Sequence, residues 1–142
     1  MQERYLFQGK STHNPEWKEG DLLVSMYSSG RLEYKIHERT PRATTWFVRP
    51  ETIRQYINRT DKQGRKIFEG DILKETFDDG DVEFLVVVWD DEESAFVLRD
   101  ATLQRRPPVP MPFQSGFSEI EVVGNKWDNP DMISGEVWEV LK

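Results

Sequence analysis

The residues of this sequence best suited to catalysis are aspartates near two expected turns. They are Asp71, Asp78, Asp79, Asp81, Asp90 and Asp91. Carboxylate oxygens are preferred ligands of Mg²⁺ and Ca²⁺, and a metal bound there could activate water for hydrolysis. A calcium loop of the EF-hand type that begins at Asp78 would need glutamate at its twelfth position, where this chain has Trp89. Since acidic hairpin tips are ordinarily solvated, a metal-dependent hydrolase is the third function that the sequence suggests.

Other catalytic arrangements are missing from the sequence. The chain has no cysteine, which excludes thiolate nucleophiles, disulfides and zinc–thiolate sites. Its two histidines, His13 and His37, lie far apart in the sequence and without the pattern of a metal-binding helix. The segment Gln114-Ser115-Gly116 lacks the Gly-x-Ser-x-Gly pattern of a serine nucleophile, and no glycine-rich phosphate loop occurs. We therefore expect a protein that is not an enzyme and that uses no metal or cofactor.

Basic and aromatic residues are interleaved in the first half of the chain, as in proteins that bind single-stranded nucleic acid. The residues expected to form such a face are Arg31, Lys35, Trp46, Arg54, Tyr56 and Arg65. A basic groove would follow the phosphates while the rings stack on bases, a combination found in small barrels. The formal net charge of −7 counts against this function, because affinity for phosphates comes mainly from cations. Nucleic-acid binding is therefore the alternative function, and aromatic residues that fill the core explain the same pattern.

The negative charge is unevenly distributed along the chain. Residues 1–68 hold 13 Lys and Arg against 8 Asp and Glu, whereas residues 69–100 hold 12 acidic residues and only two basic ones. Residues 101–142 are mildly acidic. Adjoining segments of opposite charge in one small domain usually neutralise each other in the fold, so this asymmetry does not by itself define a binding face.

Composition places the chain among soluble globular proteins. Its 142 residues are 37% hydrophobic and 32% charged, and they suffice to bury a core. No window approaches the roughly 18 apolar residues of a membrane-spanning helix, and residues 1–10 lack the apolar segment of a signal peptide. We expect a soluble protein of the cytoplasm.

Short apolar or alternating segments joined by Gly and Asp turns predict a mostly β fold. Residues 20–27 and 32–36 predict a hairpin, and residues 82–89 form the strongest strand signal. The second half of that strand is apolar on both faces, so it should be central, with residues 95–98 as its antiparallel partner. Residues 119–123 alternate and predict a late strand. Many short strands of this kind favour a single-domain barrel or sandwich over a layered α/β fold.

Four segments have weaker signals. Residues 52–57 fit either a helical turn after proline or a strand, because periodicity over six residues does not decide. Residues 105–113 contain four prolines and predict a polyproline-like loop or a sheet edge. Residues 129–133 have the signals of a helix start, and residues 137–141 are expected to add a terminal strand.

We expect one domain with three regions. These are an N-terminal hairpin region at 1–50, a core with the central hairpin at 51–100, and a proline-rich loop with terminal strands at 101–142. The sequence Glu-Gly-Asp occurs twice, at residues 19–21 and 69–71. Two copies do not make a solenoid, so each is interpreted as a turn that enters a strand, and an internal duplication stays open.

Several motifs resemble those of the YopX family of small phage and prophage proteins. They lie at residues 52–56 (TIRQY), 61–72 (DKQGRKIFEGDI) and 124–132 (GNKWDNPDM), and residues 5–10 and 17–21 resemble the family's opening. At residues 57–59 the chain departs from the usual Thr-Gly-Leu of the family. The motif residues expected to have structural roles are Gly20, Asp21, Gly64, Glu69, Gly70, Asp71, Gly124, Asn125, Asn129 and Pro130.

The resemblance implies an SH3-like or partly open β-barrel with short helical turns, a phage or prophage origin, and the bacterial cytoplasm as location. It implies no activity and no catalytic residues. The leading hypothesis is therefore an accessory protein that binds a protein of the host or the phage, without a membrane partner. Exposed strand edges and many aromatic residues also suggest a homo-oligomer.

Overall fold

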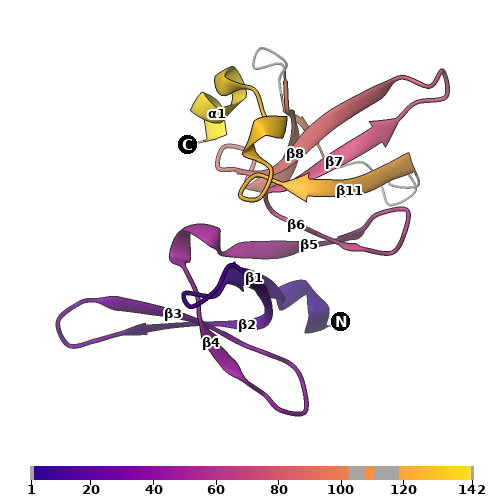
Figure 1. Ribbon diagram of the computed structural model, residues 1–142. Helices are drawn as coiled ribbons and strands as arrows, with labels where there is room; N and C mark the ends of the chain where they lie inside the picture. Colours follow the sequence, from indigo (N-terminus) through magenta and orange to yellow (C-terminus); the bar gives the residue numbers. More distant parts are fainter. Residues whose placement is uncertain (1, 103–107, 111–118, 142) are drawn as a thin grey trace. The chain divides into compact units, whose positions relative to one another are not determined.

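The computed structural model describes residues 2–102, 108–110 and 119–141, and about half of them lie in antiparallel β-strands (Figure 1). The prediction of a mostly β fold is confirmed. The chain divides into two compact units, Met1–Tyr56 and Ile57–Lys142, and the boundary falls inside one strand. The expectation of a single domain stays a prediction.

The first unit is built on an antiparallel sheet. Its elements are the 3₁₀ turn η1 (Gln2–Tyr5), β1 (Phe7–Lys10), β2 (Trp17–Met26), β3 (Leu32–His37), β4 (Thr45–Phe47), the 3₁₀ turn η2 (Pro50–Thr52) and the start of β5 (Arg54–Thr60). The strand order is β4-β3-β2-β1-β5. Residues 52–57 thus combine both alternatives left open by the sequence, because the helical turn ends at Thr52 and a strand begins at Arg54.

A close approach of two strands fixes the base of the β2–β3 hairpin. A Cβ atom at Gly20 would lie 2.1 Å from the carbonyl oxygen of His37, so only glycine fits there. Beneath the sheet, Leu6, Ile36 and Val48 are buried. The hairpin predicted for residues 20–36 is confirmed, with β2 and β3 paired from Asp21 to Met26.

The second unit contains a five-stranded sheet with apolar clusters on both faces. It comprises the end of β5, β6 (Lys66–Phe68), β7 (Asp71–Thr76), β8 (Val82–Asp90), β9 (Ala95–Asp100), β10 (Val109–Pro110), β11 (Ile120–Asn125), the 3₁₀ turn η4 (Pro130–Met132) and α1 (Gly135–Leu141). The order β10-β9-β8-β7-β11 confirms that β8 is central and that β9 is its partner. Leu85 and Val87 pack into one cluster and Val86 into the other, which explains why this strand is apolar on both faces.

The terminal region differs from the prediction in one element. Residues 137–141 were expected as a strand, but they belong to the helix α1. Ser134 precedes the helix and caps it, because its Oγ accepts a hydrogen bond from the backbone N–H of Val137 and its carbonyl accepts one from Trp138. Val137 and Leu141, one turn apart, then pack on the same cluster as Val86.

The proline-rich segment is described only in part. Val109–Pro110 form β10, which pairs with β9 at the edge of the sheet, as one of the two alternatives predicted. Residues 105–107 and 111–113, and the Gln114-Ser115-Gly116 segment, lie outside the described residues. Neither sheet closes into a barrel within the described part of the chain, because each strand order ends at two different strands.

In the turn after β11, polar side chains accept hydrogen bonds from backbone N–H groups. Asn125 Oδ1 accepts hydrogen bonds from the N–H groups of Trp127 and Asp128, and Asn129 Oδ1 accepts one from the N–H of Asn125. A Cβ at Gly124 would lie 2.5 Å from Asn129 Oδ1, so the turn requires glycine there. Gly124, Asn125, Asn129 and the η4 residue Pro130 therefore act together in one turn.

Asn58 occupies the glycine position of the Thr-Gly-Leu pattern from which the sequence departs. Its φ is 62°, in the left-handed region that glycine adopts freely and asparagine tolerates better than most residues. The departure from the family pattern at this position therefore keeps the backbone conformation that glycine would favour.

The two Glu-Gly-Asp segments lead into hairpins of the same form, 50 residues apart. In the first, the N–H of Tyr27 bonds to the carbonyl of Arg31, and Gly30 has a φ of 89°. In the second, the N–H of Phe77 bonds to the carbonyl of Asp81, and Gly80 has the same φ. Residues 19–36 and 69–86 thus form equivalent hairpins.

The carboxylate of Asp61 accepts three backbone hydrogen bonds. Its Oδ1 accepts hydrogen bonds of 2.9 Å from the N–H groups of Gln63 and Arg65, and its Oδ2 accepts one of 3.0 Å from Val122. Burial raises the pKa of Asp61, but the three donors favour the charged form more strongly and hold the pKa below its usual value. Asp61 thereby joins the β5–β6 turn to β11.

Replacing Asp61 with alanine should lower the free energy of unfolding by about 2–3 kcal/mol, because three backbone donors lose a charged acceptor. Since the folded-state pKa lies below the unfolded one, the carboxylate stabilises the fold above the unfolded pKa, and this contribution is lost as the pH falls through the folded value. The variant should therefore lose less stability than the native protein between about pH 5 and pH 2. Urea unfolding at several pH values measures both effects.

The exposed Asp79, which accepts a hydrogen bond from the N–H of Asp81, is the matched control. Asp79→Ala should change the free energy of unfolding by less than about 0.5 kcal/mol. Equal stability of the Asp61→Ala and Asp79→Ala proteins would contradict the role given to Asp61.

Candidate binding surface

The aspartates proposed as metal ligands do not form one group. Asp71 is buried and accepts a hydrogen bond from the N–H of Phe68. Asp78, Asp79 and Asp81 lie in the turn between β7 and β8, whereas Asp90 and Asp91 lie where β8 meets β9. Within residues 2–102, 108–110 and 119–141, no three His, Asp or Glu side chains are arranged to hold a metal ion.

Two of the residues predicted to form a nucleic-acid face are buried. Arg54 and Tyr56 are each only 6% exposed, and Arg54 bonds to Gln8 Oε1 while its guanidinium lies 4.0 Å from the ring centre of Trp17. Arg65 belongs to the second unit. Arg31, Lys35 and Trp46 lie on or beside the β2–β3 hairpin, as described below. The buried pair is therefore not part of an exposed face.

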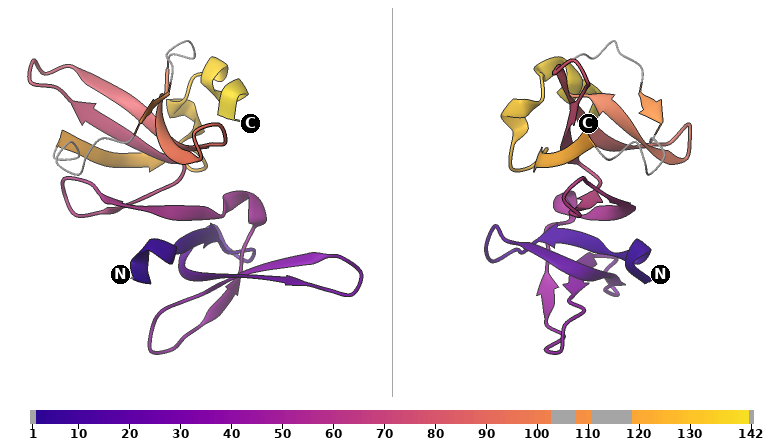
Figure 2. Two further views of the ribbon diagram at one scale, coloured as in Figure 1. Left: turned by 180° about the vertical axis from the view of Figure 1, so that it is seen from behind. Right: turned by 90° about the vertical axis from the view of Figure 1, so that its right-hand side faces the viewer.

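The β2–β3 hairpin extends from the first unit as an arm, which we define as residues 22–36 (Figures 1 and 2). β1 pairs with β2 only up to Gly20, and β4 pairs with β3 only from Lys35 onward. Large apolar side chains on the arm are exposed, and they are Leu23, Val24, Met26, Tyr27 and Leu32. The arm is thus a two-stranded ribbon on which these five apolar side chains are exposed, whereas Ile36 at its base is buried.

Strand register divides the arm into two faces. Side chains alternate along a strand, and directly paired residues share a face. The pairs Leu22–Ile36, Val24–Tyr34 and Met26–Leu32 make one face entirely uncharged, and we call it the apolar face. The pairs Leu23–Lys35 and Ser25–Glu33 lie on the other face, which we call the charged face.

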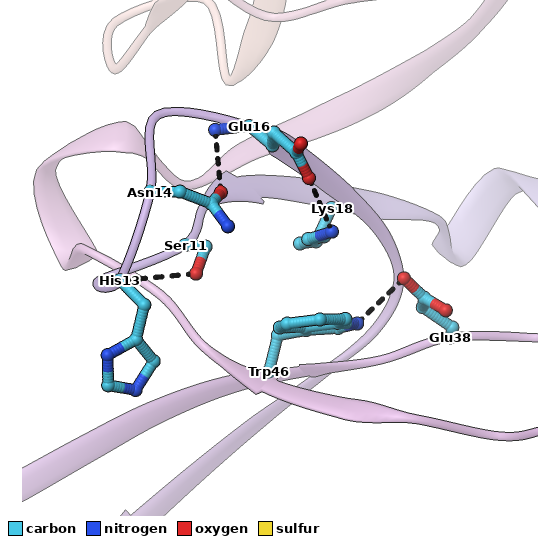
Figure 3. A network of polar contacts seen from close by, with 7 residues as sticks. All are labelled: Ser11, His13, Asn14, Glu16, Lys18, Glu38 and Trp46. Atoms are coloured by element: carbon cyan, nitrogen blue, oxygen red, sulfur yellow. Dashed lines mark hydrogen bonds and ion pairs between the residues drawn. The ribbon is translucent and has the colours of Figure 1, made fainter.

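Trp46 forms the base of the apolar face, because β4 places it opposite Ile36. Its Nε1 donates a 2.7 Å hydrogen bond to Glu38, and the Lys18 ammonium lies 3.8 Å from its ring centre (Figure 3). Lys18 is itself bonded to Glu16 at 3.0 Å. A cation over the ring and a carboxylate at its edge fix the orientation of the indole.

The loop that carries Glu16 is held by its own polar side chains (Figure 3). Asn14 Oδ1 accepts a hydrogen bond from the N–H of Glu16, and the buried Ser11 Oγ accepts one from the N–H of His13. His13 contributes its backbone to this network. His37 bonds instead to the hydroxyl of Thr45 through Nδ1, at 2.6 Å. The histidines thus lie in separate local contacts.

The charged face contains a small network around Glu33. The hydroxyl of Tyr27 donates a hydrogen bond to Glu33, and Lys35 pairs with it at 3.0 Å. The hydrogen bond from Tyr27 is the main reason that the pKa of Glu33 lies below its usual value, with Lys35 next. The guanidinium of Arg31 lies 4.6 Å from the ring centre of Tyr27. Charge on this face is therefore largely balanced within it.

The equivalent hairpin of the second unit is covered where the arm is exposed. Leu73 is fully buried, whereas its equivalent Leu23 is 43% exposed. Ile72 and Val86, equivalent to Leu22 and Ile36 of the apolar face, pack against Ile133 and against Val137 of α1. The sequence did not reveal this difference, because the two hairpins have similar apolar patterns and only their surroundings differ.

A hollow with a volume of about 420 Å³ lies in the second unit. Glu69, Trp89, Asp91, Arg99 and Lys126 contribute to its lining. Burial lowers the pKa of Lys126, although the nearby Glu69 acts in the opposite direction. Charges of both signs line this hollow, so it selects for no particular ligand charge, and the arm is the stronger candidate.

Comparisons with known proteins give matches over most of the chain. A family model described as YopX protein matches residues 6–134. The crystal structure of YopX from Bacillus subtilis has a TM-score of 0.56 and 15% identity, with 92% of this chain and 99% of that one covered. A crystal structure from Enterococcus faecalis has a TM-score of 0.53 and 20% identity, with 90% and 96% covered. No curated protein matches the sequence.

The solved structures share the fold of this chain, and at 15% and 20% identity they show the fold alone.

None of the helices in the described part of the chain has the length and apolar composition needed to cross a bilayer.

The equivalent leucines of the two hairpins, Leu23 and Leu73, test whether the arm is a surface or part of a core. Leu73→Ala should lower the free energy of unfolding by about 3 kcal/mol, because it opens a cavity in a closed cluster. Leu23→Ala should lower it by less than about 1 kcal/mol, because its side chain is partly solvated already. Urea unfolding of both variants measures the difference. Similar losses would mean that the arm is packed as tightly as its equivalent.

Proposed function

The chain belongs to the YopX family, and on this premise we propose that it is a phage or prophage accessory protein of the bacterial cytoplasm that acts by binding a host or phage protein. The apolar face of the arm is the observation that supports this function best. Val24 and Met26 are 51% and 71% exposed, and no charged residue interrupts the face. A contiguous exposed apolar surface is typical of a protein interface.

The proposal includes the form of the interface. Trp46 and Tyr34 supply aromatic rings at the base and middle of the apolar face, and such residues commonly dominate binding energy. Lys18 and Glu38 orient the indole before any partner arrives, which reduces the entropy lost on binding. The partner is therefore a protein with a complementary apolar patch, and the role is not enzymatic.

Placing a charge on the apolar face should weaken partner binding. Leu32→Lys puts an ammonium among apolar groups and should weaken binding at least tenfold, or about 1.4 kcal/mol. Ser25→Lys adds the same charge to the charged face and is the matched control. Tagged native protein, Leu32→Lys and Ser25→Lys would each be used to capture proteins from infected or lysogenic cells, and the captured protein would then be purified for titration calorimetry.

Two outcomes would contradict the proposal. In one, Leu32→Lys binds the purified partner as tightly as the native protein. In the other, metal-replete protein turns over a nucleic acid, nucleotide or peptide, and Asp79→Ala loses that turnover.

Nucleic-acid binding is the second candidate, and the exposed rings of the charged face favour it. Tyr27 and Phe47 are about half exposed, and the cations of Arg31 and Lys35 lie 4.6 and 5.9 Å from their ring centres. Such pairs could contact bases and phosphates together.

A fluorescent single-stranded oligonucleotide distinguishes this candidate. Binding would be strongest at about 50 mM salt and should fall steeply as salt rises, because counterions are released. Fluorescence anisotropy measures it, with Arg31→Gln as the variant that should weaken binding. If anisotropy does not change at low salt, nucleic-acid binding is rejected and the protein-binding function is unaffected.

A further inference from the structure

The outer edge of β2 has no strand beside it along the arm. In the described residues, β2 pairs with β1 at residues 17–20 and with β3 at residues 21–26. Its edge over residues 22–26 therefore faces solvent. β3 has a shorter open edge, because β4 covers residues 35–37 and the N–H of Val48 bonds to the carbonyl of Tyr34.

The register shows which backbone groups point outward. The N–H of Tyr27 bonds to Arg31 across the hairpin, and inward and outward groups alternate along an antiparallel strand. The N–H and C=O groups of Leu22, Val24 and Met26 therefore point away from β3. They form a row of donors and acceptors spaced for another strand.

Within the part of the chain that the structure describes, this edge has none of the features that keep strand edges apart in solution. Proteins usually protect such an edge with a lysine, a proline, a bulge or a covering segment. Residues 22–26 are Leu, Leu, Val, Ser and Met, with no charge and no proline. Val24 and Met26 are among the most exposed apolar residues of the chain.

The second unit shows how this fold closes the same edge. β11 pairs with β7 over residues 71–75, which are equivalent to residues 21–25 of β2. There Glu121 lies opposite Lys74, so an acid meets a base. Val24 replaces that lysine in the arm. A strand that closes the edge of β2 should therefore present an uncharged residue opposite Val24.

From these observations we infer that β2 of the arm pairs antiparallel with β2 of a second copy of this chain. A two-fold axis at Val24 places Val24 opposite Val24, Leu22 opposite Met26 and Leu23 opposite Ser25 of the second copy. In a two-fold pairing, residues close to the axis lie opposite the same residues of the second copy. A charge near the axis would therefore lie close to the like charge of the second copy. Residues 22–26 are uncharged, which makes this strand complementary to itself.

The pairing gives one continuous sheet through both arms. Val24 opposite Val24 is a cross-strand pair of β-branched residues, which suits a sheet. A two-fold axis perpendicular to the sheet leaves the two apolar faces side by side on the same surface. The inference does not depend on the proposed function, because pairing uses the edge of the arm whereas the partner would use its face.

Sedimentation equilibrium of the full chain tests the pairing. The native protein should change from the 16.8 kDa monomer to twice that mass as its concentration rises from about 1 to about 200 µM. Val24→Pro should stay monomeric, because proline removes an outward donor without removing a bond to β3. Val24→Thr keeps the N–H and the β-branched shape, and it should dimerise like the native protein.

A charge-swap experiment identifies the axis itself. Val24→Lys and Val24→Glu should each be monomeric, because like charges face each other across the axis, and an equimolar mixture of the two should restore the dimer. Their urea midpoints should match the native value, since Val24 is exposed.

Three results would overturn the inference. They are a native protein that is monomeric over the whole range, a Val24→Lys protein that dimerises as well as the native one, and a mixture that remains monomeric. Loss of the dimer with partner binding intact in Val24→Pro, or loss of partner binding with the dimer intact in Leu32→Lys, separates this inference from the proposed function.

Discussion

Every strand of this protein must find partners for its backbone N–H and C=O groups, and the fold is organised by where those partners come from. Within a hairpin these partners come from the next strand, because a tight turn places it beside the first. Gly30, Gly64 and Gly80 all have φ near 85°, a conformation that other residues adopt only with strain. Where no strand is available, side chains take over, as Asp61 and Asn125 do for the ends of their turns.

Short-range pattern was sufficient to predict the hairpins and the central strand. Alternation in residues 32–36 and the two-sided apolar run of β8 depend on neighbours in sequence, and both were confirmed. The terminal helix was wrongly expected as a strand, because five apolar-rich residues fit either period and the deciding contact is the cap at Ser134.

Exposure was not predictable from the sequence. Leu23 and Leu73 follow the same Glu-Gly-Asp entry, yet the first is on a surface and the second is in the core. The difference lies in the surroundings, because residues distant in sequence, such as Ile120, pack in the cluster that holds Leu73. Arg54 and Tyr56 show the converse case, since a cation and an aromatic ring that suggest a binding face are buried in the first unit.

The repeated turns also bear on how the chain acquires its structure. The hairpins at residues 27–31, 61–65 and 77–81 each close over a few residues, so little chain entropy opposes them. β11 must instead find β7 across more than forty residues, and such distant pairings generally form late and slowly. During that interval the edge of β7 would be open, as the edge of β2 is in the folded chain. The folded arm thus keeps an open strand edge that the equivalent hairpin of the second unit has only until β11 pairs with β7.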